Sequence, residues 1–166
     1  MRPFQANISG GTTDAEVYWM NDGANLYLAV RVLQSSLNNV NDVRFDFDNN
    51  GDGIPAVGDD AIGYQGEDML PIDQYLDRKC LNRSQSGCGK NDGSVDVDGA
   101  VANDGTWTTF ELSHPLVGDQ GEDFSVGTGD ALGFFLSIQQ GNGAQGNTQW
   151  PGFRTYETIT IVGPGS

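Results

Sequence analysis

The sequence predicts an all-β fold, an antiparallel sandwich of two sheets in a jelly-roll-like arrangement. Apolar and polar residues alternate with a period of two through most of the chain, and helical periodicity is nearly absent. Turn residues separate the alternating segments, and glycine makes up 24 of the 166 residues without a Gly-X-Y period. About eight or nine short strands with turns between them are typical of one sandwich domain, here expected to span residues 1–166.

The first half of the chain contains the clearest strands. Residues 4–8 are the candidate first strand, and residues 17–20 and 26–32 flank the turn Asn21-Asp22-Gly23, which predicts a hairpin. Its second strand places four apolar residues on one face: Leu26, Leu28, Val30 and Val32. Residues 43–48 alternate strictly, so Val43, Phe45 and Phe47 are expected to point into the core.

The second half continues the pattern after an irregular insert. Residues 66–93 contain Pro71, a predicted helical turn at 72–76 and a cysteine loop. A second hairpin is predicted around Asn103-Asp104-Gly105, and Trp107, which opens its second strand, is expected in or near the core. The remaining strands are expected at residues 61–64, 94–101, 107–112, 132–138 and 158–162.

Two cysteines close a short polar loop. Cys80 and Cys88 enclose the seven residues Leu-Asn-Arg-Ser-Gln-Ser-Gly, which predicts a disulfide that ties down the insert and an oxidising compartment. Such a bridge contributes roughly 2–3 kcal/mol in the entropic model. The alternative is a pair of free thiols in a cytosolic protein.

The first residues, Met1-Arg2-Pro3-Phe4, do not begin an apolar signal segment. We therefore expect a module of a larger secreted or cell-surface protein.

The charge of the chain excludes several classes of partner. Asp and Glu number 23 against 8 Lys and Arg, giving a net charge of −15, which repels nucleic acids and anionic membranes. No apolar run is long enough to span a bilayer. With one histidine and two cysteines, a zinc site made only of histidines or only of cysteines cannot be built.

The acidic residues are mostly Asp, 18 of them against 5 Glu, and they concentrate in one motif. Residues 46–53 read Asp-Phe-Asp-Asn-Asn-Gly-Asp-Gly, and Gly58-Asp59-Asp60 follow. Oxygen ligands at alternate positions, with glycines for the sharp turn, predict a Ca²⁺ site rather than an ordinary acidic turn. The motif is no EF-hand, because Val57 stands where the bidentate Glu belongs.

The predicted calcium ligands are side-chain oxygens of Asp48, Asn50 and Asp52, the backbone carbonyl of Ile54, and a closing carboxylate from Asp60 or Asp59. Asp46 either joins them or bonds loop amides, because the inward-pointing Phe45 and Phe47 put it on the opposite face of the sheet. The ion's expected role is structural, since it offsets the repulsion between these carboxylates.

Five pieces in a fixed order carry a family resemblance. They are a Tyr-Trp strand with an Asn-Asp-Gly turn, Asn25-Leu26-Tyr27-Leu28-Ala29-Val30, the 46–60 motif, Gly105-Thr106-Trp107-Thr108-Thr109-Phe110-Glu111-Leu112 leading to Pro115-Leu116, and Gly129-Asp130-Ala131-Leu132-Gly133-Phe134. This order resembles the DOMON-like group, which includes the family 9 carbohydrate-binding modules and the haem subunit of ethylbenzene dehydrogenase, over roughly residues 14–162. The resemblance implies a two-sheet sandwich, often with calcium, in a larger secreted protein that binds sugar, haem or no known ligand. The cysteine loop and the lack of a strand before Phe4 depart from it.

A weak carbohydrate site is predicted on a loop near the C-terminus. Gln149, Trp150, Phe153 and Arg154 combine aromatic faces for a sugar ring with groups that bond hydroxyls. Tyr64 and Tyr75 flank the insert and are further candidates. The competing interpretation of Trp150 is plain packing of the loop.

Other functions have less support in the sequence. Haem would need axial ligands from His114, Met20, Met69 or Met1, and a lone His before Pro is usually a surface or hydrogen-bonding residue. No catalytic motif occurs, so we expect no enzyme. A structural or adhesion module without a small ligand is the main alternative to sugar binding.

Overall fold

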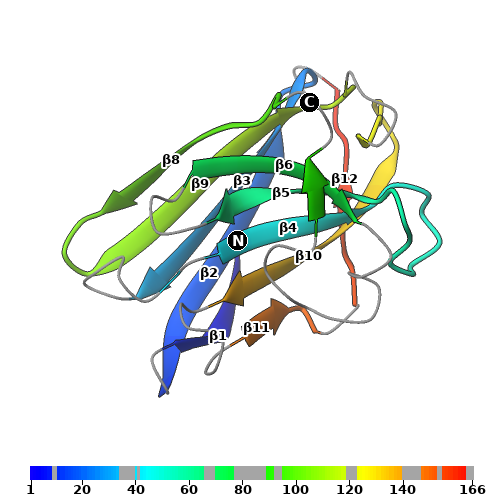
Figure 1. The fold of residues 1–166 in the computed structure, drawn as a ribbon. Coiled ribbons are helices and arrows are strands. Elements are labelled where there is room, and N and C mark those ends of the chain that lie inside the picture. Colours follow the sequence, from blue (N-terminus) through cyan, green and yellow to red (C-terminus); the bar gives the residue numbers. More distant parts are fainter. Residues whose placement is uncertain are drawn as a thin grey trace.

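The chain folds as a sandwich of two antiparallel sheets, as the sequence predicts (Figure 1). The computed structural model describes residues 1–8, 11–33, 40, 42–65, 70–76, 89–91, 95–118, 123–139, 147–152 and 155–163. These residues form twelve strands and no helix. None of the described part could therefore cross a membrane as a helix.

One sheet has five strands in the order β1-β2-β3-β9-β8. Their bounds are Arg2–Ile8 (β1), Gly11–Asn21 (β2), Asn25–Leu33 (β3), Asp98–Asn103 (β8) and Trp107–Pro115 (β9). Both predicted hairpins are confirmed: β2 pairs with β3, and β8 pairs with β9. Gly23 and Gly105 adopt φ angles of 90° in the two turns, a conformation that glycine reaches without strain.

The other sheet has seven strands, in the order β11-β10-β4-β5-β6-β7 with β12 also pairing β10. Their bounds are Asp42–Asp48 (β4), Asp60–Gln65 (β5), Leu70–Leu76 (β6), Gly89–Asn91 (β7), Ala131–Gln139 (β10), Asn147–Trp150 (β11) and Glu157–Thr160 (β12). The helical turn predicted at 72–76 is wrong. Those residues belong to β6, which pairs with β5 from Leu70 to Tyr75, so sheet pairing overrides the local effect of Pro71.

The core lies between the sheets and contains the residues that alternation predicted. The apolar stripe of β3 at positions 26, 28, 30 and 32 is at most 2% exposed. Phe45 and Phe47 from β4 are fully buried opposite it, and Phe134 from β10 packs 5.9 Å from Phe45 between ring centroids. Period-two alternation therefore identifies the inner faces of β3 and β4 correctly.

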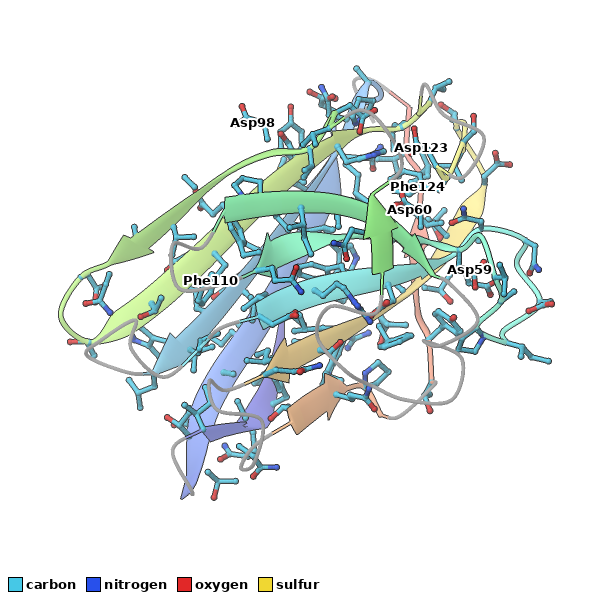
Figure 2. All side chains as sticks on the ribbon, viewed as in Figure 1. Asp59, Asp60, Asp98, Phe110, Asp123 and Phe124 are labelled. Atoms are coloured by element: carbon cyan, nitrogen blue, oxygen red, sulfur yellow. The ribbon has the colours of Figure 1, made fainter. Side chains whose placement is uncertain are left out.

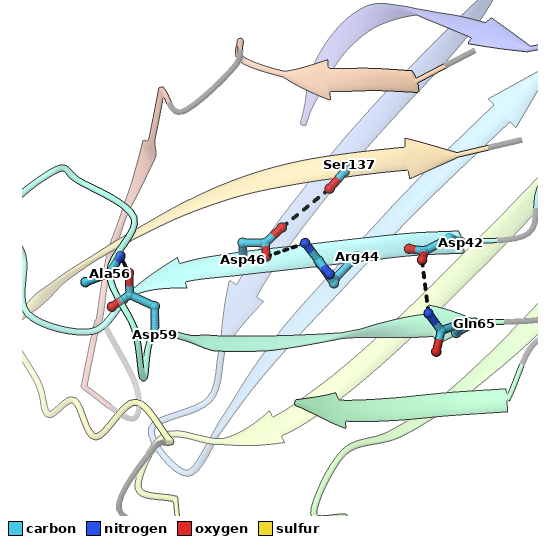
Figure 3. Close-up of polar contacts among 7 residues, drawn as sticks. All are labelled: Asp42, Arg44, Asp46, Ala56, Asp59, Gln65 and Ser137. Atoms are coloured by element: carbon cyan, nitrogen blue, oxygen red, sulfur yellow. Dashed lines mark hydrogen bonds and ion pairs between the residues drawn. The ribbon is translucent and has the colours of Figure 1, made fainter. Parts of the chain in front are cut away.

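The other face of β4 is buried as well, and it is polar (Figure 3). Arg44 and Asp46 form an ion pair at 3.0 Å, and Ser137 Oγ donates to Asp46 at 3.4 Å. Gln65 Nε2 donates to the carboxylate of Asp42 at 3.5 Å. Burial raises the pKa of Asp46, and it raises that of Asp42 to about 6, although the charge of Arg44 opposes both shifts.

Trp107 is not in the core, contrary to the prediction. It occupies an outward position of β9, because its neighbour Thr108 is the residue that points inward and is fully buried. The guanidinium carbon of Arg31 lies 4.6 Å from the Trp107 ring centroid. This cation–π contact covers the indole face that the sequence assigned to the interior.

Candidate carbohydrate site and metal loop

A hollow of about 570 Å³ lies on the outer face of the five-stranded sheet. It is open to solvent and draws on four strands: β2, β3, β8 and β9. The side chains that give it chemical character are Tyr18, Met20, Tyr27, Asp98, Glu111 and Ser113.

Strand register explains why these residues meet. Across the sheet Tyr18 pairs with Ala29, Ala29 with Glu111, and Glu111 with Ala100. Ala29 leaves the space between Tyr18 and Glu111 low, and Ala100 ends the row on the edge strand β8. The next row runs from Met20 through Tyr27 and Ser113 to Asp98. The apolar partners of these strands point inward, so all these side chains point outward.

Both tyrosines are held by carboxylates. The hydroxyl of Tyr18 donates to Glu16, and that of Tyr27 donates to Asp22 Oδ2 at 2.8 Å. These hydrogen bonds are the main reason that the pKa of each tyrosine is raised. Asp22 is itself fixed, because its Oδ1 accepts from the amides of Ala24 and Asn25 in the β2–β3 turn. The aromatic walls are therefore oriented before any ligand arrives.

The chemistry of the hollow suits a polyol with an apolar face. Aromatic rings pack against the C–H side of a sugar ring, while carboxylates such as Asp98 and Glu111, both exposed, accept hydrogen bonds from hydroxyls. The same two carboxylates repel anionic ligands. Neutral sugars fit this surface better than uronic or sulfated ones.

Tyr64, one of the predicted ligand-binding residues, lies beneath this face rather than on it. It is 1% exposed, packs against Phe110 at 6.0 Å, and donates through its hydroxyl to the carbonyl oxygen of Glu111 at 2.6 Å. Burial raises its pKa to about 12. The added Cβ of an alanine at Gly99 would lie 2.1 Å from the Tyr64 hydroxyl. Tyr64 therefore supports the floor of the hollow from the core side of the sheet.

The predicted loop site is only partly described. Trp150 is half-buried in β11 and contacts Phe4, Trp19 and Phe134 at centroid distances of 6.0 to 6.1 Å. Gln149 is half-buried beside it. Phe153, Arg154 and the side chain of Tyr75 lie outside the described residues, as do both cysteines of the predicted disulfide. The contacts of Trp150 are those of a residue that packs at the margin of the core.

The structure does not bring His114 and Met20, two of the candidate haem ligands that it describes, together. His114 is inward-facing and fully buried in β9, so of the two roles expected of a His before Pro it has the hydrogen-bonding one, with Nδ1 2.7 Å from the carbonyl oxygen of Pro115. Met20 is 63% exposed on the opposite, outer face, and Met1 is 67% exposed. Met69 lies outside the described residues. His114 and Met20 cannot ligate one haem from opposite faces of one sheet.

The 48–59 loop brings several of the predicted calcium ligands close together. Asp48 Oδ1 and Asn50 Oδ1 lie 3.2 and 2.9 Å from the same amide nitrogen, that of Asp52. Asp48 Oδ2 also accepts from Gly53 at 2.8 Å, and the carboxylate of Asp52 accepts from the amide of Ile54 at 2.8 Å. Oxygens of alternate residues therefore converge on amides of the loop itself.

The loop also separates the roles of Asp59 and Asp60. Asp59 accepts from the amide of Ala56 at 2.6 Å and from that of Asn49 at 3.4 Å, so it faces the loop (Figure 3). Burial raises its pKa to about 6, and the negative charges of Asp48 and Asp52 contribute to the shift. Asp60 begins β5, and like Ile62 and Tyr64 on that strand it points between the sheets. Asp46 contacts Arg44 instead of the loop amides.

Sequence reasoning missed the hollow because its residues come from four strands. One signal was present in the predicted β2–β3 hairpin. Its register places Tyr27 opposite Met20 and Ala29 opposite Tyr18, on the face that the apolar stripe of β3 leaves outward. Two outward tyrosines within one hairpin could have been read from the sequence, but Asp98 and Glu111 required the β3–β9 pairing.

Comparison with known proteins supports the fold. The sequence matches no protein-family model and no curated protein. Among solved structures it is similar to a family 9 carbohydrate-binding module from Caldicellulosiruptor kristjanssonii in complex with glucose, with 15% sequence identity and a TM-score of 0.51. The similarity covers 95% of this chain and 82% of that one. The chain thus has the β-sandwich fold of that carbohydrate-binding module.

Proposed function

We propose that this chain is a non-catalytic carbohydrate-binding module that binds neutral glycans in the hollow on the outer face of the five-stranded sheet. The observation that carries the proposal is the pairing of two anchored tyrosines with two exposed carboxylates around a floor of small residues. The similar sandwich solved with glucose supports sugar as the ligand class.

The expected affinity follows from the size of the site. One shallow hollow offers aromatic packing and a few hydrogen bonds, which is consistent with dissociation constants from micromolar to millimolar. The carboxylates Asp98 and Glu111 replace water as partners of sugar hydroxyls, so they contribute more to selectivity than to affinity. Their charge opposes uronic and sulfated polysaccharides.

We also propose that the module works outside the cell and uses calcium as a structural ion in the 48–59 loop. The convergence of Asp48, Asn50 and Asp52 oxygens supports the ion, and Asp59 is the closing carboxylate that faces it. The asparagine- and aspartate-rich, highly acidic composition fits a calcium-containing exterior.

The test is calorimetric titration with soluble neutral polysaccharides and an anionic one of matched length. We expect heat with at least one neutral glycan and none with the anionic polymer. Tyr27→Ala should weaken binding at least about tenfold, since aromatic anchors of this kind contribute more than 1 kcal/mol. Tyr27→Phe keeps the ring and separates its contribution from that of the hydroxyl.

Trp107→Ala is the matched control, because Trp107 is an aromatic residue of the same face that does not line the hollow. Its affinity should equal that of the unmodified chain. If Trp150→Ala removes binding while Tyr27→Ala does not, the site is the C-terminal loop rather than the hollow. An absence of heat with every glycan would favour the structural or adhesion role.

A further inference from the structure

A second polar cluster lies at one end of the space between the sheets. Ligand-type atoms of Asp60, His114 and Asp123 lie within 4.8 Å of one another, and the three residues are 1%, 0% and 8% exposed. Figure 2 shows Asp60 and Asp123 together at this end of the sandwich, beside Phe124. Within the described part of the chain this is the one such triad of His, Cys, Asp or Glu.

The cluster joins segments far apart in sequence. Asp60 begins β5 of the seven-stranded sheet, His114 belongs to β9 of the five-stranded sheet, and Asp123 lies between β9 and β10. A fourth residue, Asp96, comes from the segment before β8 and places its Oδ1 2.7 Å from His114 Nε2. A cation bound here would link both sheets and two connecting segments.

His114 is oriented as a metal ligand is. Its Nδ1 lies 2.7 Å from the carbonyl oxygen of Pro115, and because a carbonyl only accepts, Nδ1 carries the proton in that bond. Nε2 is then the ring nitrogen that would bind a metal, as in metal sites where the other ring nitrogen donates to a backbone carbonyl, and it lies 2.7 Å from Asp96 Oδ1. The ring of Phe124 packs 4.6 Å away and holds the imidazole in place.

The composition of the cluster suits a cation. Carboxylate oxygens and an imidazole nitrogen are both common ligands of divalent metals. A bound cation also stabilises buried carboxylates directly.

The chain around Asp123 is shaped to hold it. An alanine Cβ at Gly118 would lie 2.1 Å from the Asp123 Cβ and 2.3 Å from its Oδ2. Only glycine allows the two segments to approach this closely. Backbone bonds from Gly118 to Phe124 at 3.3 Å and from Val126 to Leu116 at 2.8 Å fix both segments.

From this geometry we propose a zinc-type divalent metal site formed by Asp60, His114 and Asp123, with Asp96 beside it. A mixed set of imidazole nitrogen and carboxylate oxygen suits Zn²⁺, whereas Ca²⁺ takes oxygen ligands only. Tetrahedral Zn²⁺ with bonds of 2.0–2.2 Å places its ligands about 3.3 Å apart, and the three ligand-type atoms lie within 4.8 Å of one another. The site is separate from the calcium loop, because Asp59 faces that loop and Asp60 faces inward.

The single histidine of the chain provides a direct test. Tag-free protein labelled with ¹⁵N-histidine is stripped with a chelator and titrated with Zn²⁺, while nitrogen-to-ring-proton correlation spectra follow both ring nitrogens. We expect one Zn²⁺ per chain, a large shift of the Nε2 resonance, and an Nδ1 that stays protonated. Asp60→Asn and Asp123→Asn should each lower the zinc affinity at least about tenfold.

Asp52→Asn is the matched control, since it makes the same chemical change in the calcium loop and should leave the zinc affinity unaltered. If excess Zn²⁺ leaves both ring-nitrogen resonances of His114 unchanged, the proposed metal site is wrong. A shift caused by Ca²⁺ but not by Zn²⁺ would overturn the choice of metal. If the cluster variants do not fold, the titration of the unmodified chain alone decides between these outcomes.

Discussion

Asp42 has surroundings that favour its protonated form. It is 1% exposed on the polar face of β4, and burial raises its pKa to about 6 from 3.8. Arg44 opposes the shift, Asp46 adds to it, and Gln65 donates to the carboxylate. Because the pKa is raised on folding, the folded state binds this proton more tightly than the unfolded chain does. The contribution of Asp42 to stability is therefore best below about pH 4 and is lost as the pH rises through 6.

Asp42→Asn should remove this pH dependence. The difference between about 6 and 3.8 corresponds to roughly 2–3 kcal/mol at pH 7, so we expect the variant to be more stable by up to that amount there and unchanged near pH 4. Urea unfolding at pH 4, 5, 6 and 7 measures it. If the free energy of unfolding of Asp42→Asn depends on pH in the same way as that of the unmodified chain, Asp42 does not cause the pH dependence.

Gly63 on β5 lies too close to β4 to leave room for a side chain. A Cβ at this position would stand 2.1 Å from the carbonyl oxygen of Val43 and 2.8 Å from the Cα of Arg44. Both are backbone atoms that cannot rotate away. We expect Gly63→Ala to lower the free energy of unfolding by more than about 2 kcal/mol, measured by urea unfolding.

Gly11→Ala is the control for that substitution. A Cβ at Gly11, also in a strand, would meet no atom within 4 Å. Its effect should stay within about 0.5 kcal/mol. Equal losses in the two variants would mean that the conformational freedom of glycine, and not the close approach of β4 to β5, decides the result.

At the scale of elements, two hairpins of the five-stranded sheet use the same turn chemistry. Asp22 accepts from the amides of Ala24 and Asn25, and Asp104 accepts from those of Thr106 and Trp107. Backbone hydrogen bonds are the main reason that the pKa of each aspartate is lowered. Asp22 alone also accepts from a tyrosine hydroxyl, that of Tyr27.

These turns therefore form a natural pair for mutation. Asp22→Ala and Asp104→Ala should lower the melting temperature by similar amounts, because each removes two backbone hydrogen bonds. Asp22→Ala should in addition weaken glycan binding several-fold, since Tyr27 loses its anchor, whereas Asp104→Ala should not. Thermal melts and calorimetric titration of both variants measure this. If the two variants bind glycan with equal affinity, the hydrogen bond that anchors Tyr27 does not contribute to binding.

Alternation predicts strands that have one apolar and one solvated face, and it fails where that condition does not hold. β3 was predicted well because its inward residues are apolar and buried while its outward residues are only partly buried or exposed. In β4 the polar residues Arg44 and Asp46 are as buried as Phe45, which period-two reasoning cannot show. β6 was mistaken because Pro71 breaks its local pattern while the pairing with β5 defines the strand.

At the scale of the whole molecule, the fold was easier to predict than the sites. Most inner-face residues are apolar, so alternation along each strand identifies them. The hollow depends on register between four strands, and the Asp60–His114–Asp123 cluster depends on how the sheets stack. The calcium motif is the exception, because its ligands lie within one loop and their spacing is a property of the sequence alone.

Because the net charge is −15, cations stabilise the whole molecule by screening its surface as well as by binding at any single site. The carboxylates of the 48–59 loop add to a general repulsion that any salt reduces by screening. A bound Ca²⁺ acts differently, since its stabilisation grows as RT ln(1 + [Ca²⁺]/Kd) and reaches about 2.7 kcal/mol at a hundredfold excess over Kd. For a domain of this size that corresponds to an increase of roughly 5–10 °C in Tm.

The prediction is a higher Tm in millimolar Ca²⁺ than in EGTA, at a constant and high concentration of NaCl that screens the general repulsion. Asp52→Asn should remove most of the calcium-dependent part, because it weakens one of the converging oxygens near Asp48 and Asn50. Asp98→Asn, which removes the same charge on the outer face of the other sheet, should retain it. Mg²⁺ at equal concentration should raise Tm less, since it keeps its waters and demands octahedral geometry. Equal increases in Tm for Ca²⁺ and Mg²⁺, or for both variants, would mean that the loop binds no specific calcium ion and that screening of the whole surface accounts for the effect.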